Sequence, residues 1–105
     1  MPYKVLVIPG DGVGPEVVEA ALYVIKAAAS KYGVDLEIKT AEAGDAALRK
    51  YGTAMPPEAL KLADEADVIF KGPIGESAYD VTSLIRMRYL LYANIRPVKN
   101  LPGVP

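Results

Sequence analysis

The distribution of apolar residues along the chain predicts three strands that alternate with helices. Residues 3–9 form a short run rich in β-branched side chains that ends in Pro and Gly, which is typical of a strand buried on both faces in a parallel sheet. Apolar and charged residues alternate from Val34 to Thr40, which predicts a half-exposed strand near a sheet edge. Residues 66–70 form a further apolar run that we interpret as a second buried strand.

Helical patterns lie between these strands. From Glu16 to Tyr32, Pro15 suits the first helical position and Gly33 suits the end of the helix. Shorter helices are predicted over 43–51 and 57–65, a third main helix over 78–91, and an extended piece over 92–98. The residues predicted to face inward are Val17, Ala21, Val24, Ile25 and Ala28 in the first helix and Ala59, Leu60 and Ala63 in the helix over 57–65. This alternation predicts a single α/β segment spanning 1–105: an open, mostly parallel sheet with flanking helices.

Composition narrows the range of functions. The 105 residues are 51% apolar, which is enough for a real core, and 12 basic against 13 acidic residues leave a net charge of −1. This balance argues against a nucleic-acid partner, and the short apolar runs argue against a membrane span, so we expect a cytoplasmic protein. The chain contains neither Cys nor His, so acid–base chemistry within it would have to use Asp, Glu, Lys or Tyr.

A glycine-rich loop follows the first predicted strand. Gly10, Gly12 and Gly14 resemble the dinucleotide-binding pattern G-x-G-x-x-G, but the third glycine comes one residue early. Asp11 within the loop would also repel a pyrophosphate. Spacing therefore favours a tight strand-to-helix turn that needs glycine for its backbone angles, with a phosphate-binding cradle of N–H groups as the alternative.

The helix predicted over 78–91 carries a polar face with an arginine at its centre. Arg86 shares this face with Tyr79, Thr82, Ser83 and Tyr89. Arginine offers a planar fork that holds both oxygens of a carboxylate, so the face suits carboxylate binding. We expect Arg96 to lie on a strand after this helix and to converge on the same anion. The alternative is that Arg86 and Arg88 are ordinary solvated charges, which composition alone favours.

Three motifs, which follow one another along the chain, favour carboxylate binding by the arginines over the alternative of solvated charges. The stretches VLVIPGDGVGPEV, LADEADVIFKGPIG and YANIRPVKNLPG resemble signatures of the β-decarboxylating dehydrogenases, which act on isocitrate, 3-isopropylmalate or homoisocitrate. The resemblance implies oxidation of a 2-hydroxy dicarboxylic acid by NAD or NADP with Mg²⁺ or Mn²⁺, followed by loss of CO₂, in a homo-oligomer. It assigns substrate binding to Arg86, Arg96, Thr82 and Asp80, and cofactor contacts to Lys71, Ile74 and Val13. It also makes the glycine loop a family signature rather than a dinucleotide site.

The same resemblance places the family's catalytic tyrosine and lysine, its third arginine and its aspartate metal ligands after residue 105. We therefore expect no catalytic and no metal-binding residue within this chain. The chain would be a truncated piece of a longer enzyme, namely the N-terminal part of its large domain. Two alternatives are a self-standing α/β module that binds a small ligand and a non-catalytic subunit of a multi-chain dehydrogenase. The nucleotide sequence beyond codon 105 would distinguish these possibilities.

The residues before Arg86 bear on the substrate. Isocitrate enzymes typically carry Ser and Asn six and four residues before this arginine, where this sequence has Asp80 and Thr82. A carboxylate at Asp80 would repel the additional carboxylate of isocitrate by roughly 1 kcal/mol, which favours 3-isopropylmalate over isocitrate or homoisocitrate. Equally, Asp80 suits the start of a helix, where it would stabilise exposed N–H groups.

Overall fold

A computed structural model describes residues 2–76 and 80–105 and confirms the predicted α/β alternation. Helices and strands lie within a few residues of their predicted positions. In chain order they are β1 (Tyr3–Ile8), α1 (Gly14–Tyr32), β2 (Leu36–Thr40), α2 (Asp45–Tyr51), α3 (Pro57–Glu65), β3 (Val68–Lys71) and α4 (Asp80–Arg88).

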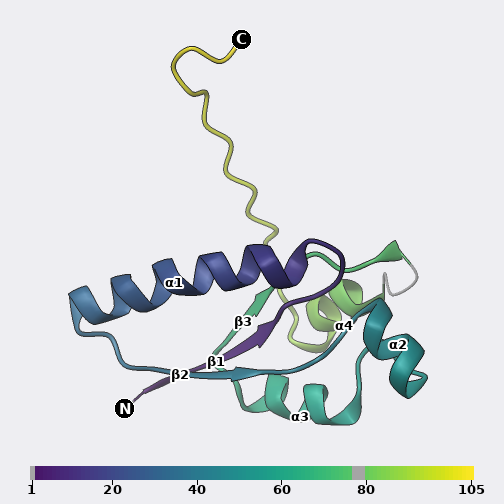
Figure 1. The fold of residues 1–105 in the computed structure, drawn as a ribbon. Coiled ribbons are helices and arrows are strands. Elements are labelled where there is room, and N and C mark those ends of the chain that lie inside the picture. The colour runs from purple at the N-terminus through teal and green to yellow at the C-terminus, as the bar shows by residue number, and fades with distance from the viewer. Residues whose placement is uncertain (1, 77–79) are drawn as a thin grey trace.

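The three strands form one parallel sheet in the order β2-β1-β3. In this register Val5 of the central strand lies between Ile38 and Val68. Helix α1 covers one face and α3 the other, while α2 and α4 gather beyond the carboxyl ends of the strands (Figure 1). The chain passes from β1 to one neighbouring strand and later returns to its other side, so a topological switch point lies at β1. In such sheets ligands bind outside the carboxyl ends of the strands at this point.

The core is built on the central strand. Leu6, Val7 and Ile8 are almost completely buried. Leu6 and Ile8 belong to a cluster on the face that carries α3 and α4, whose other buried members are Ala43, Met55, Ala59, Ala63, Val81 and Ile85. The inward positions predicted for α3 are therefore confirmed for Ala59 and Ala63, and Leu60 is half-buried. Two buried residues, Val81 and Ile85, anchor α4 to this core.

Of the residues predicted to face inward on α1, Ala21 and Ile25 are half-buried as expected, whereas the rest of the predicted face was wrong by about one residue of rotation. Val17 and Val24 are 54% and 69% exposed, and Ala28 is exposed too, whereas Val18 is buried. The helix carries valine and alanine on two faces, so periodicity alone did not choose between them. Close packing against the sheet determines which face is buried. A Cβ at Gly72 would lie 2.9 Å from the side chain of Val18, so the helix approaches the end of β3 at Val18.

Two further expectations also need correction. Strand β3 is not buried on both faces, because Val68 is 53% exposed, and it forms an edge of this sheet. Residues 92–98 form no strand: the chain from 91 to 101 has no regular structure, and it runs away from the body as a tail (Figure 1). The tail has no hydrogen-bonded neighbour strand, and Pro97 lacks the N–H that pairing would use. Among the described residues, no helix is long and apolar enough to cross a membrane.

Candidate functional site

Asp11 connects two loops and the start of a helix at the carboxyl ends of the strands. Its Oδ2 accepts the backbone N–H groups of Asp45 and Gly75, each at 2.8 Å, and its Oδ1 accepts that of Ala46 at 3.2 Å. One carboxylate thus joins the loop after β1, the first turn of α2 and the loop after β3. Helix α2 begins after Gly44, which has no side chain to cap the helix, so Asp11 supplies that cap from a distant part of the chain.

These contacts fix the ionisation of Asp11. Burial raises the pKa of its carboxyl, but hydrogen bonds from the N–H groups of Gly75, Asp45 and Ala46, with the charge of Arg49, lower it more. The net effect is a pKa below the ordinary value of 3.8, so Asp11 is an anion near neutral pH. Sequence inspection treated Asp11 only as an obstacle to a pyrophosphate and missed this structural role.

The glycine loop packs against the loop after β3. Gly10 has a positive φ of 82°, and a side chain there would collide with the carbonyl oxygen of Pro73. The N–H of Asp11 donates to that same carbonyl at 2.7 Å, and the N–H of Gly14 donates to the carbonyl of Asp11 at 2.8 Å. These N–H groups are already hydrogen-bonded within the protein. The geometry therefore favours a tight structural turn over a phosphate-binding cradle.

A cavity of about 500 Å³ lies between β3 and α4. It contains three of the residues that the sequence predicted for ligand binding: Lys71, Thr82 and Arg86. Lys71 is the last residue of β3, so it stands at the carboxyl end of the strand, and the other two lie one turn apart on α4. The remaining lining residues are mostly apolar: Ala63, Ala66, Asp67, Val68, Ile69, Ile85, Tyr89 and Leu91.

Two cations share this cavity. Burial, and then the nearby charge of Arg86, lower the pKa of the Lys71 ammonium below its usual value of 10.5. The Lys71 ammonium donates a hydrogen bond to the carbonyl oxygen of Gly72 at 2.9 Å. Among the described residues, neither Lys71 nor Arg86 forms an ion pair with a carboxylate. Two such cations beside an apolar wall suit a ligand that has both carboxylate and apolar groups.

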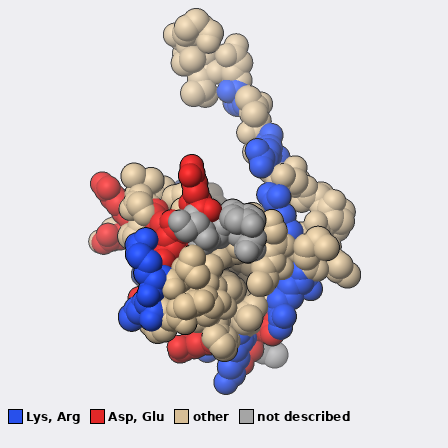
Figure 2. Space-filling model, turned by 90° about the vertical axis from the view of Figure 1, so that its right-hand side faces the viewer, with Lys and Arg blue, Asp and Glu red and all other residues tan. Residues whose placement is uncertain are grey.

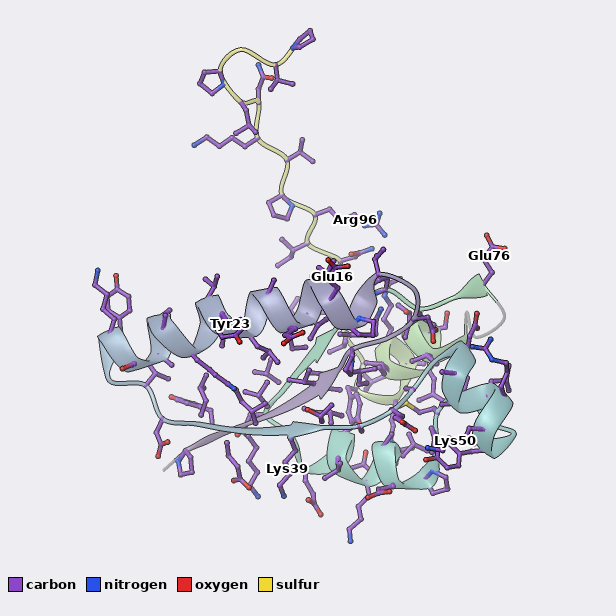
Figure 3. The ribbon with its side chains drawn as sticks, in the orientation of Figure 1. Glu16, Tyr23, Lys39, Lys50, Glu76 and Arg96 are labelled. Atoms are coloured by element: carbon purple, nitrogen blue, oxygen red, sulfur yellow. The ribbon has the colours of Figure 1, made fainter. Side chains whose placement is uncertain are left out.

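The other predicted site residues lie elsewhere. Ile74 is half-buried and packs against the core cluster, and Val13 is 64% exposed just before α1. Arg96 lies on the tail, outside the body of the protein, where its Nε donates to Asn94 at 3.4 Å (Figure 3). The structure therefore brings Lys71, Thr82 and Arg86 together, but it does not bring Arg96 to the same cavity.

Figure 2 shows the protein from the side at which the strands end. In this view basic side chains lie along the tail and where it leaves the body. Asp80 is the first residue of α4. Its side chain lies outside the described part of the structure, and so does Tyr79, which the sequence placed on the polar helix face.

The residues also allow a test of metal binding. Within 2–76 and 80–105, no group of three or more acidic side chains is arranged to hold an ion. Of the acids at the carboxyl ends of the strands, Asp11 is already engaged by three N–H groups. The described residues do not fit a divalent cation, and we assign them no metal-dependent step.

Together these features define a class: a parallel α/β protein with helices on both faces of its sheet and a cavity along β3 that contains two cationic side chains. Comparison with known proteins identifies the family. The family model for isocitrate/isopropylmalate dehydrogenase matches residues 4–104, so the chain belongs to this family.

Individual relatives agree with this assignment. The chain is 49% identical over 104 residues to a 3-isopropylmalate dehydrogenase from Saccharolobus solfataricus, covering 99% of this chain and 31% of that protein. It is 50% identical over 102 residues to a 3-isopropylmalate dehydrogenase from Methanothermobacter thermautotrophicus, covering 97% and 30%. The chain thus spans about a third of the length of these curated relatives.

Solved structures show the same fold. The crystal structure of isocitrate dehydrogenase from Methylococcus capsulatus superimposes with a TM-score of 0.70 at 36% identity, covering 86% of this chain and 26% of that one. The expected parallel α/β fold of this family is therefore confirmed.

Proposed function

We propose that this chain forms the N-terminal part of the large domain of a 3-isopropylmalate dehydrogenase. The observation that carries the proposal is the cavity between β3 and α4, where Lys71 and Arg86 provide positive charge beside a mostly apolar wall. The substrate, 3-isopropylmalate, combines two carboxylates with an apolar isopropyl group. Relatives named for this substrate are 49% and 50% identical to the chain, which supports the choice.

In this proposal each cavity residue has a distinct task. Arg86 holds one substrate carboxylate through its bidentate fork and fixes its orientation. Thr82, one turn earlier on α4, offers a hydroxyl to the same end of the substrate, and the Lys71 ammonium adds positive charge from β3. Ile85 and Ile69 provide apolar surface for the isopropyl group. We expect the carboxylate of Asp80 to border the same group, as the comparison with isocitrate enzymes implies, and Arg96 to join the second carboxylate if the tail folds back.

The cofactor and assembly rest on the family relationship. NAD, or NADP, would accept a hydride from the carbon that bears the 2-hydroxy group, the hydroxyl proton would pass to a base outside this chain, and Mg²⁺ or Mn²⁺ would be held by residues outside this chain. Lys71, Ile74 and Val13 remain the proposed contacts of this chain with the cofactor. We propose a homo-oligomeric enzyme of leucine biosynthesis that acts in the cytoplasm on a small dicarboxylate.

The experiment that tests this function compares two purified proteins. The first is a family-length enzyme, by which we mean a protein of about the length of the relatives above that carries residues 1–105 as its N-terminal part. It should reduce NAD with 3-isopropylmalate as substrate, and more slowly with isocitrate. The 105-residue chain alone should form no NADH above background, because it holds part of a substrate wall and no assigned general base. NADH formation at 340 nm measures both. Turnover by the isolated chain would contradict the proposal that it holds only part of the active site. Faster turnover of isocitrate than of 3-isopropylmalate by the family-length enzyme would contradict the proposed substrate.

Replacing Asp80 by serine should relax the preference of the family-length enzyme for 3-isopropylmalate. The change removes a carboxylate that would repel the extra carboxylate of isocitrate, so kcat/KM for isocitrate should rise by roughly five- to tenfold, equivalent to about 1 kcal/mol. Turnover of 3-isopropylmalate should change little. If Asp80 serves only to stabilise the start of α4, thermal stability will fall while the ratio of the two kcat/KM values stays constant.

A further inference from the structure

A hydrogen-bonded tie joins the end of α3 to the end of α4. Arg88 donates from Nε to Oδ1 of Asp64 and from Nη2 to Oδ2 of Asp64, each at 2.7 Å, and the hydroxyl of Tyr89 donates to Oδ1 of the same carboxylate at 2.7 Å. The two arginine bonds form a bidentate pair, which fixes orientation as well as distance. Sequence inspection found neither Asp64 nor this use of Tyr89, because the partners lie 24 and 25 residues apart.

The tie stands beside the candidate substrate cavity. Asp64 follows Ala63, which lines the cavity from α3. Arg88 and Tyr89 come two and three residues after Arg86, and the ring of Tyr89 lines the cavity as well. Asp64 therefore connects the wall formed by α3 to the turn of α4 that carries Arg86.

Apolar contacts hold the side of this turn that faces the core: Ile85 is buried directly before Arg86, and Leu84 and Tyr89 pack against the core cluster. Helix α4 has nine residues, too few for an isolated helix to be stable in water. Its buried anchors, Val81 and Ile85, both precede Arg86. After the tie the chain turns sharply: Leu90 has a positive φ of 51°, and the N–H of Leu91 donates to the carbonyl oxygen of Arg86 at 3.0 Å. The backbone of Arg86 thus takes part in the helix end that the tie joins to α3.

Ionisation of the tie is consistent with this role. Hydrogen bonds from Arg88, and then from Tyr89, lower the pKa of the Asp64 carboxyl to about 2. Burial, and then its bond to Asp64, raise the pKa of the Tyr89 hydroxyl. The carboxylate stays charged and the phenol stays protonated over the whole range in which a dehydrogenase is assayed.

We propose that Asp64 is a positioning residue for substrate binding, which holds the last turn of α4 so that Arg86 faces Lys71 across the cavity. Asp64 itself does not line the cavity. The effect on turnover rests on the proposed function, whereas the effect on the order of α4 does not.

The test uses Asp64→Asn in the family-length enzyme, which keeps the shape of the side chain and removes its charge. The matched control is Glu65→Gln, which neutralises the neighbouring exposed acid at the end of α3. Hydrogen exchange of the amides of Tyr89, Leu90 and Leu91 should become at least about tenfold faster in Asp64→Asn, while the amides of β1 should keep their rates. KM for 3-isopropylmalate should rise by roughly five- to tenfold with kcat within about twofold, as expected for loss of uniform substrate binding. Arg88→Gln should reproduce both changes, and Asp64→Glu should recover part of each.

Unchanged hydrogen exchange in Asp64→Asn would show that Asp64 does not hold the last turn of α4, which contradicts the proposal. Faster exchange with an unchanged KM would mean that Asp64 is only structural, which overturns its positioning role. If the wild-type enzyme turns over no 2-hydroxy dicarboxylate, the proposed function fails. The exchange result then decides independently whether Asp64 holds the turn that carries Arg86.

Discussion

Replacing Arg86 by lysine should lower kcat/KM for 3-isopropylmalate by roughly ten- to a thousandfold in the family-length enzyme, at about 1.4 kcal/mol for each factor of ten. Lysine keeps the positive charge but loses the planar fork that holds both oxygens of a carboxylate. It also brings a second ammonium beside that of Lys71, whose pKa is already lowered by burial and by Arg86. The substrate would then be bound without a fixed orientation, which slows the chemical step.

Steady-state kinetics measures this effect, and Arg49→Lys is a matched control because Arg49 is an exposed arginine on α2, outside the cavity. The control should retain wild-type kinetics. If Arg86→Lys behaves like the wild type while Arg96→Lys loses activity, the tail and not α4 provides the arginine that matters. That outcome would contradict the site.

Replacing Asp11 by alanine should destabilise the fold by about 2–3 kcal/mol near neutral pH. The change leaves the N–H groups of Asp45, Ala46 and Gly75 without their acceptor, and the loss of hydrogen bonds to a charged group costs about 1–3 kcal/mol each when the groups are buried. The lower total reflects the partial exposure of this site to water. Urea unfolding measures the difference, and Asp35→Ala is the control, since Asp35 is an exposed aspartate in the loop before β2.

The same variant predicts a pH dependence with a definite sign. The folded-state pKa of Asp11 is lowered, so its charged form contributes stability that is fully present above the ordinary value of 3.8 and is lost as pH falls through the lower folded-state value. The stability difference between wild type and Asp11→Ala should therefore be constant from pH 5 to 8, as roughly expected for a fully ionised carboxylate, and shrink below pH 3.8. An equal difference in acid and at neutral pH would show that the carboxylate does not hold the loops.

The sequence predicted the order of the elements well, because each strand and helix has its own local signal. Proline marks the start of α1 and of α3, glycine marks the end of α1, and alternation identifies β2 as an edge strand. Local periodicity fails where a helix has two apolar faces. In α1 the choice between Val17 and Val18 depends on the close approach of Gly72, which is far away in sequence.

For the candidate site too, the sequence indicated residues that are close together in the chain but not contacts between residues that are far apart in it. Thr82 and Arg86 could be predicted as neighbours because they lie one turn apart on a single helix, and the structure places Lys71, which was predicted as a cofactor contact, in the same cavity. Asp11 and Asp64 were missed as structural groups, since their partners lie between 24 and 64 residues away and no spacing rule connects them. Arg96 was placed on a strand from its extended pattern, but that pattern does not specify a neighbour, and the structure shows a tail.

Chemical footprinting of arginine tests most directly whether Arg86 binds the substrate. The family-length enzyme is treated with phenylglyoxal, which modifies exposed guanidinium groups, with and without saturating 3-isopropylmalate, and the modification of each arginine is followed by mass spectrometry. Arg86 is exposed in the structure and is therefore open to the reagent. We predict that substrate slows the modification of Arg86 several-fold and leaves that of Arg49 unchanged. Equal modification of Arg86 with and without substrate, in an enzyme that turns over 3-isopropylmalate, would contradict the proposed site.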